Sequence, residues 1–140
     1  MASGIYNEAK AEWMKGTYDF VNDTIKCALM NNTHAFTASD AGWASVSANE
    51  ITGTGYTAGG ATLAGNAVTK DDVNNKGVFD ANDVSWTGAS FTAYHAVLYD
   101  DTPTSPADPL IASIDFGGAQ TVTSGTFTIQ WDSAGILTIA

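Results

Sequence analysis

The sequence predicts a mostly β protein, either an antiparallel β-sandwich or a jelly-roll-like barrel, preceded by a short N-terminal helix or arm. After residue 24, runs of Thr, Val, Ile, Phe, Tyr and Trp alternate at short spacing with clusters of Gly, Asn, Asp, Pro and Ser. Such alternation is typical of strands divided by turns. Helical periodicity is confined to the start of the chain, whose 140 residues are the size of one domain. We therefore expect one domain over residues 1–140, with the helix or arm over 1–20 and the β-sandwich over 21–140.

The N-terminal segment is the one part of the chain expected to be helical. Three apolar residues recur there at helical spacing, Ile5, Ala9 and Trp13. Ser3 or Asn7 can cap the helix at its start, and Gly16 can end it. The segment also carries large apolar side chains that should not lie bare in water, namely Trp13, Met14, Tyr18 and Phe20. We therefore expect it to pack on its own sheet or on a neighbouring subunit.

The first strand is expected where Ile25, Cys27 and Leu29 alternate with Lys26 and Ala28, so that one of its faces is buried. Later strands are expected over residues 61–69, 77–80, 84–87, 91–99, 110–116, 125–131 and 136–139. A helical turn over 37–46, a glycine-rich loop over 51–60 and an exposed loop over 100–108 should connect them. The last two strands should form a hairpin through the turn at 132–135. The final strand is then either a buried member of the sheet or an edge open to a partner.

Composition disfavours several classes of partner. The net charge is -10, and the five cations are all lysines. Because nucleic-acid binding needs clustered Lys and Arg, this charge predicts repulsion from DNA, RNA and anionic membranes. The chain starts without a signal-peptide pattern and has no run of about 20 apolar residues. We expect a protein made and kept in the cytoplasm unless it leaves within a larger particle.

Two glycine patterns resemble nucleotide-binding motifs without matching them. Residues 55–62 have the glycine spacing of a phosphate loop, but Ala61 stands where that motif requires lysine. A dinucleotide fingerprint fails too, because Ala58 follows Gly53 and Gly55 where the third glycine belongs. A tightly turned loop is the better interpretation of both patterns.

One acidic stretch approaches the spacing of a calcium loop. The residues at positions 1, 3, 6, 9 and 12 are Asp72, Asn74, Gly77, Asp80 and Asp83. Lys76 occupies position 5, where an oxygen ligand belongs, and position 12 lacks the usual glutamate. We expect solvated turn carboxylates here and no bound metal.

Catalytic chemistry has few candidates. The two histidines are His34 and His95, and the single cysteine is Cys27, which cannot form an internal disulfide. A triad of Cys27, His95 and an aspartate would need a thiol of lowered pKa, yet Lys26 should point to the opposite face of the strand. His95 is interpreted as a hydrogen-bonded core or interface residue. We therefore expect no enzymatic activity and no catalytic, cofactor or metal site.

Aromatic side chains in the later strands could line a sugar-binding face, namely Trp86, Phe91, Tyr94, Tyr99, Phe116, Phe127 and Trp131. At this spacing most should be core residues, because one face of each strand is buried. We expect two or three of them to be exposed enough to anchor a subunit contact, where aromatic residues are enriched.

Four segments together resemble a known class of proteins: residues 23–29 (DTIKCAL), 50–63 (EITGTGYTAGGATL), 78–86 (VFDANDVSW) and 110–117 (LIASIDFG). They are similar to small virion structural proteins of tailed bacteriophages, over most of the chain from Tyr6 to Ile139. The chain differs from that pattern at Ala41, Gly42 and Trp43.

The resemblance implies a particle component without catalytic residues. The first expectation is a capsid decoration, or cement, protein on the outside of the head shell that binds the major capsid protein or other virion proteins as a homo-oligomer, for example a trimer. An acidic surface fits the outside of a shell, away from the packaged genome. A tail or neck component is the second expectation, and a carbohydrate- or receptor-binding β module is the alternative of a different class.

Overall fold

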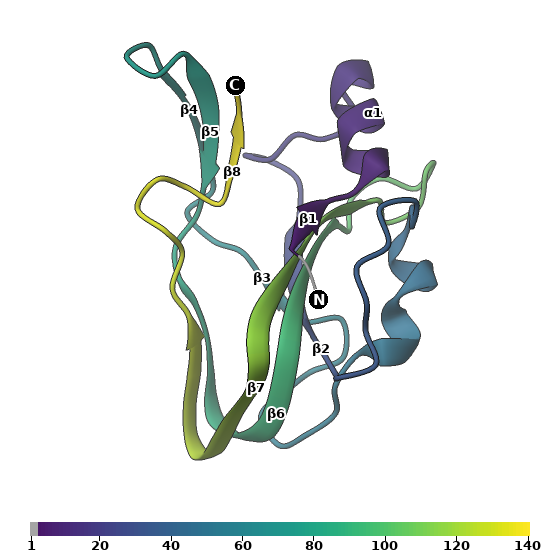
Figure 1. The fold of residues 1–140 in the computed structure, drawn as a ribbon, viewed down its shortest axis with the longest axis vertical. Helices are drawn as coiled ribbons and strands as arrows, with labels where there is room; N and C mark the ends of the chain where they lie inside the picture. The colour runs from purple at the N-terminus through teal and green to yellow at the C-terminus, as the bar shows by residue number, and fades with distance from the viewer. Residues whose placement is uncertain (1–2) are drawn as a thin grey trace.

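The computed structural model describes residues 3–140 and shows a mostly β chain with one short α-helix (Figure 1). This confirms the predicted mostly β class with a short N-terminal helix. In chain order the elements are β1 (Gly4–Ile5), α1 (Asn7–Lys15), β2 (Ile25–Met30), the 3-10 turns η1 (Trp43–Ser45) and η2 (Ser47–Asn49), β3 (Ala61–Thr62), β4 (Ala67–Asp71), β5 (Lys76–Asp80), β6 (Val84–Asp100), β7 (Leu110–Ile129) and β8 (Leu137–Ile139).

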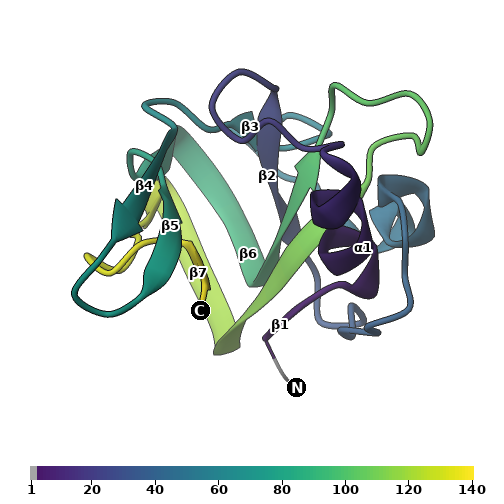
Figure 2. The same ribbon diagram turned by 90° about the horizontal axis from the view of Figure 1, so that it is seen from above.

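The strands form two antiparallel sheets. The larger has the order β1-β7-β6-β2-β3, and the smaller has the order β4-β5-β8. The sheets lie in a sandwich-like arrangement, and their strands do not close into a barrel (Figure 2). Phe79 of the smaller sheet packs on Phe20, with ring centroids 4.7 Å apart, and so joins the core that the two sheets share.

A long bent hairpin of β6 and β7 is the main support of the fold. The four strands expected between residues 84 and 131 are two strands of 17 and 20 residues. The prediction of separate strands was wrong because residues such as Gly88, with φ of +57°, form bulges within a continuous ladder instead of turns. The register of the pair shifts at four places, and the ribbon bends so that its two halves face one another (Figure 2).

Strand β2 is buried on both faces for most of its length, and the prediction of a single buried face was wrong. Ile25, Cys27 and Leu29 belong to the core between the sheets, whereas Ala28 and Met30 belong to a second buried cluster on the other face. That second cluster is covered by Tyr6 and by the segment that carries Val46. The alternation of residues within a strand does not reveal whether a distant segment of the chain covers its second face.

Helix α1 ends as predicted and begins differently. Gly16 adopts a left-handed conformation, with φ of +76°, and ends the helix. The capping position is held by Tyr6 without a side-chain hydrogen bond, so neither Ser3 nor Asn7 caps the helix. The Ser3 hydroxyl instead accepts a hydrogen bond from the Asp115 amide at 2.8 Å, which ties the start of the chain to β7. Ala9 and Glu12 are the residues of the helix buried against the body.

The smaller sheet corrects two further predictions. The strand expected over 61–69 is divided into β3 and β4, which lie in different sheets and are separated by Gly65, with φ of +67°. The final hairpin was also wrong: the turn at 132–135 forms, but β8 leaves β7 and pairs with β5. In the described chain β8 is an edge strand, which was one of the two predicted alternatives.

The segments that connect the strands contain little regular secondary structure. The glycine-rich segment over 51–60 is a loop, as predicted, and residues 101–109 connect β6 to β7. The helical turn expected over 37–46 is reduced to η1. None of the helices in residues 3–140 has the length and apolar character that crossing a membrane requires.

Candidate functional site

The glycine-rich loop is folded around a carboxylate of its own chain. The Glu50 Oε1 atom accepts hydrogen bonds from the Tyr56 hydroxyl at 2.7 Å and from the Gly59 amide at 2.6 Å. The Tyr56 hydroxyl also accepts a hydrogen bond from the Leu29 amide at 3.0 Å, which binds the loop to β2. Because an internal carboxylate takes the Gly59 amide, that amide is not offered to a phosphate in this arrangement. These hydrogen bonds hold the loop against β2 of the larger sheet.

The residues with calcium-loop spacing do not surround a common point. They are strung along the β4–β5 hairpin and the segment after it. Asp71, which lies outside the predicted set, holds the turn by accepting hydrogen bonds from the amides of Val73 and Asn74. Asp83 accepts a hydrogen bond from the amide of Trp131, a residue that is far from Asp72 in the sequence. Within residues 3–140, no three His, Cys, Asp or Glu side chains gather as a metal site would require.

Cys27 and His95 lie on opposite faces of the larger sheet. Met30 is the cross-strand neighbour of His95 and belongs to the second buried cluster, whereas Cys27 belongs to the core between the sheets. Burial raises the pKa of the Cys27 thiol to about 12. A buried, protonated thiol is a poor nucleophile. The structure therefore does not bring the suggested triad together.

Instead, the structure brings the two histidines together, a contact that sequence analysis missed. The rings of His34 and His95 lie edge to face, with centroids 5.0 Å apart, and both residues are buried. His34 Nε2 is 3.0 Å from the Ser113 hydroxyl, and His95 Nε2 is 3.6 Å from Asp115 Oδ1. Burial and then the neighbouring imidazole lower the pKa of His34 to about 4. Because Ser113 is itself buried, this cluster pins the segment after β2 onto the sheet and offers no open nucleophile.

Asp100 is a second buried polar residue without an obvious sequence signal. Its Oδ1 atom accepts a hydrogen bond from the Thr102 amide at 3.0 Å, and the residue is fully buried at the end of β6. Burial raises the pKa of Asp100 to about 7; the Thr102 hydrogen bond opposes the shift and the adjacent Asp23 carboxyl adds to it. In such a buried position the neutral carboxylic acid is lower in free energy than the charged carboxylate, because burial removes the water that would solvate the charge.

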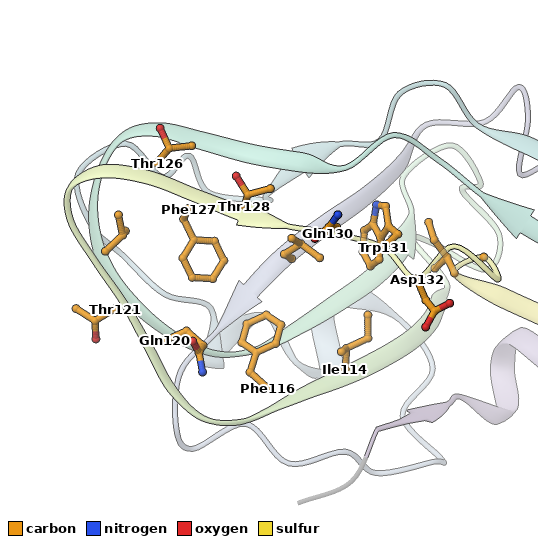
Figure 3. Close-up of a pocket in the computed structure, with 14 residues that line it drawn as sticks. Ile114, Phe116, Gln120, Thr121, Thr126, Phe127, Thr128, Gln130, Trp131 and Asp132 are labelled. Carbon is orange, nitrogen blue, oxygen red and sulfur yellow. The ribbon is translucent and has the colours of Figure 1, made fainter.

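A recess of the surface lies inside the curve of β7 (Figure 3). We call it the β7 groove; it has a volume of about 620 Å³. Its apolar and aromatic lining includes Ile114, Phe116, Val122, Phe127, Ile129, Trp131 and Ile136, and its polar lining includes Gln120, Thr121, Gln130 and Asp132. Figure 3 shows the rings of Phe116 and Phe127 inside the curve, while the side chains of Thr126 and Thr128 turn away from it.

Three of the seven aromatic residues considered above line this groove. Phe116, Phe127 and Trp131 are half-buried there, whereas Trp86, Phe91 and Tyr99 are buried. The Phe116 and Phe127 rings are 6.2 Å apart, and Phe127 continues inward to Phe91 at 5.2 Å. The groove is thus an opening through which the aromatic core reaches the surface.

The outer edge of β7 borders the groove and lacks a partner strand for most of its length. In residues 3–140, β1 pairs with β7 only at Ala112 and Ser113, and no other strand follows on that side. Residues 114–129 contain no Lys, Arg or Pro, and Asp115 is their single charged residue. Natural edge strands are usually protected by charges, prolines or short length. A long edge without that protection is suited to pairing with another chain.

Comparison with known proteins adds no assignment. No protein-family model, curated protein or solved structure matches this chain.

Proposed function

We propose that this protein is a structural subunit that acts by binding other protein subunits, and that it serves as a capsid decoration protein of a tailed bacteriophage. The observation that carries the proposal is the β7 groove together with the unprotected edge of β7. A partner strand at that edge would gain backbone hydrogen bonds and could place apolar side chains in the groove, as in other cases of β-strand addition.

The net charge of the chain agrees with this role. A net charge of -10 disfavours contact with the packaged genome and suits the outer side of a shell. On a shell, many copies of the subunit would be attached together, so that modest individual contacts suffice for strong retention. The resemblance to small virion proteins motivates the choice of a phage particle. A tail or neck component would use the same groove and edge.

A carbohydrate-binding role is the weaker alternative. Sugar sites need polar groups that converge beside an aromatic face. The β7 groove has polar residues in its lining, but Thr126 and Thr128 turn away from the aromatic rings of Phe116 and Phe127 (Figure 3). The indole N–H of Trp131 already donates a hydrogen bond to the Asn82 carbonyl at 3.0 Å. A glycan array that shows specific binding, abolished by Trp131→Ala, would favour this alternative.

The test is mass spectrometry and electron cryo-microscopy of purified particles from a phage that encodes this chain. We expect many copies of the subunit on the head. Val122→Glu, which places a charge in the groove, should remove the subunit from particles, whereas Thr123→Glu on the adjacent exposed residue should not. Thermal melts of both variants serve as folding controls. Absence of the chain from particles, or unchanged retention of a folded Val122→Glu variant, would contradict the proposal.

A further inference from the structure

We infer that the β7 groove binds the β4–β5 hairpin of a second copy of this chain. The inference rests on the proposed function and names the partner of the same site. It assigns β4 of one subunit to the open edge of β7 in the next, with Val68 directed toward the groove and Lys70 directed toward Asp132.

The smaller sheet carries most of the exposed large apolar side chains. Among the described residues these are Met14, Val21, Val68, Val73 and Ile139, and the last three belong to the smaller sheet or its turn. Val68 is 54% exposed and Val73 is 89% exposed. The β4–β5 hairpin stands away from β6 and β7 at the periphery of the molecule (Figures 1 and 2). One subunit therefore presents both an apolar recess and an apolar projection.

The register of the smaller sheet sets the direction of these side chains. Val68 is paired with Phe79, and Phe79 with Leu137, so the three share one face. Phe79 and Leu137 are buried in the core on that face, whereas Val68 lies on the outer strand and stays exposed. Lys70 follows two residues later on the same face. An apolar residue and a cation thus lie side by side on a strand whose outer edge has no partner in residues 3–140.

A cation distinguishes β4 from the other strands of a second copy that have an unpaired edge. Subunits with a net charge of -10 repel one another, so a contact that places a cation of one copy against a carboxylate of the next is favoured over one that does not. The lining of the β7 groove contains the carboxylate of Asp132 and no cation. The β4–β5 hairpin carries more carboxylates than lysines, but among the strands of residues 3–140 that have an unpaired edge only β4 carries a lysine, Lys70. In the isolated subunit Lys70 is paired with the exposed Asp72 at 2.9 Å, a contact that is easily exchanged.

A contact of this kind joins two different surfaces of the same chain. Such head-to-tail interfaces generate closed rings when the rotation closes, and filaments when it does not. A small ring, such as a trimer, satisfies the groove and the hairpin of every subunit at once. Pairing of β4 with β7 across subunits would also remove both unprotected edges.

The first experiment detects the contact without mutation. Copies labelled with 14N and 15N are mixed, allowed to exchange and treated with a zero-length carbodiimide, which joins lysine amines to carboxylates. We expect a mixed-isotope link between Lys70 and Asp132. Lys10 on α1 is the internal control and should give no mixed-isotope link to Asp132. If the Lys70 to Asp132 link is missing, or is found only within one copy, the inference is overturned.

The second experiment measures association by sedimentation velocity. The wild-type chain should sediment as an oligomer, and Val68→Glu or Val122→Glu should raise the dissociation constant at least tenfold. Thr69→Glu, on the opposite face of β4, is the matched control and should stay close to wild type. A monomeric wild-type chain, or equal effects of Val68→Glu and Thr69→Glu, would overturn the inference. If Val122→Glu still abolished particle binding in that case, the proposed function would stand with a different partner in the groove.

Discussion

The two halves of the β6–β7 hairpin differ both in sequence and in how far the rest of the chain covers them. In the half that includes Val97, Leu98, Leu110 and Ile111, both faces are covered and these residues are fully buried. In the other half, residues 117–124 of β7 are almost entirely exposed, and one face of the hairpin opens into the β7 groove. In the covered half the strands are buried on both faces. The open half contributes buried residues on one side only and leaves most of residues 117–124 exposed to solvent.

The largest expected difference between the halves comes from two apolar residues on β7, Ile111 and Val122. Ile111→Ala should lower the free energy of unfolding by about 2 to 5 kcal/mol, because it empties a fully buried position. Val122→Ala, at the half-buried lining of the groove, should cost about half as much or less, because part of that side chain already contacts water. Urea unfolding of dilute protein measures both. Equal losses would show that the open half is as well packed as the covered one.

Two glycines, one in the loop packed on β2 and one in the open half of the hairpin, test a similar contrast between covered and open backbone. Gly60 and Gly117 both have left-handed φ values, +83° and +78°. A Cβ atom at Gly60 would overlap the Cys27 carbonyl oxygen of β2, whereas a Cβ atom at Gly117 meets no atom within 4 Å. Gly60→Ala should therefore cost about 2 to 5 kcal/mol, the sum of backbone strain and overpacking. Gly117→Ala should cost only the strain, about 1 to 2 kcal/mol. Thermal unfolding of the two variants measures both losses. A loss for Gly117→Ala as large as that for Gly60→Ala would contradict the prediction.

The buried histidines predict a pH effect that belongs to the covered half. The pKa of His34 in the folded protein is about 4, below its ordinary 6.5, so the unfolded chain binds the proton first. Its contribution to stability is present above pH 6.5 and is lost as the pH falls toward 4. The pKa of Asp100 is raised to about 7, so its contribution has the opposite sign and grows as the pH falls below 7.

Variants separate these two opposing contributions. From pH 7 to pH 4, the stability advantage of wild type over His34→Gln should shrink by up to about 3 kcal/mol. Asp100→Asn removes the opposing contribution and should make the acid loss steeper than in wild type. Urea midpoints measured across this range test both signs. Parallel profiles for wild type and His34→Gln would show that His34 is not held neutral by its surroundings.

Local pattern was enough to predict the fold class and the ends of several elements. The change from helical to twofold periodicity near residue 24 identified the helix and the first strand, and Gly16 marked the end of the helix. These features depend on residues close in the sequence. The partner of β8 did not follow in the same way, because Leu137 pairs with Phe79 and a local turn at 132–135 gives no information on distant pairing.

The groove and the histidine pair show where sequence reasoning stopped. His34 and His95 are far apart in the sequence and meet because the segment after β2 folds over β6, which neither residue indicates alone. The groove depends on the bend of β7, and one signal for that bend was present. Gly117 and Gly118 interrupt an otherwise strand-like run, and glycine inside a strand often marks a bend or bulge. Treating that pair as a bend within one strand would have indicated that the segment with Phe116 and the segment with Phe127 face one another.

The smallest expected effect concerns a hydroxyl pair on the exposed side of the open half. Ser85 and Thr128 lie opposite each other on β6 and β7, with their hydroxyl oxygens 2.8 Å apart. A double-mutant cycle of Ser85→Ala and Thr128→Ala should give a coupling of about 0.2 to 1 kcal/mol in dilute protein, as for other exposed cross-strand pairs. The isolated subunit exposes both residues, so water competes for each hydroxyl. A coupling well above this range would mean that the pair is withdrawn from water, and hence that this side of the hairpin is covered in solution.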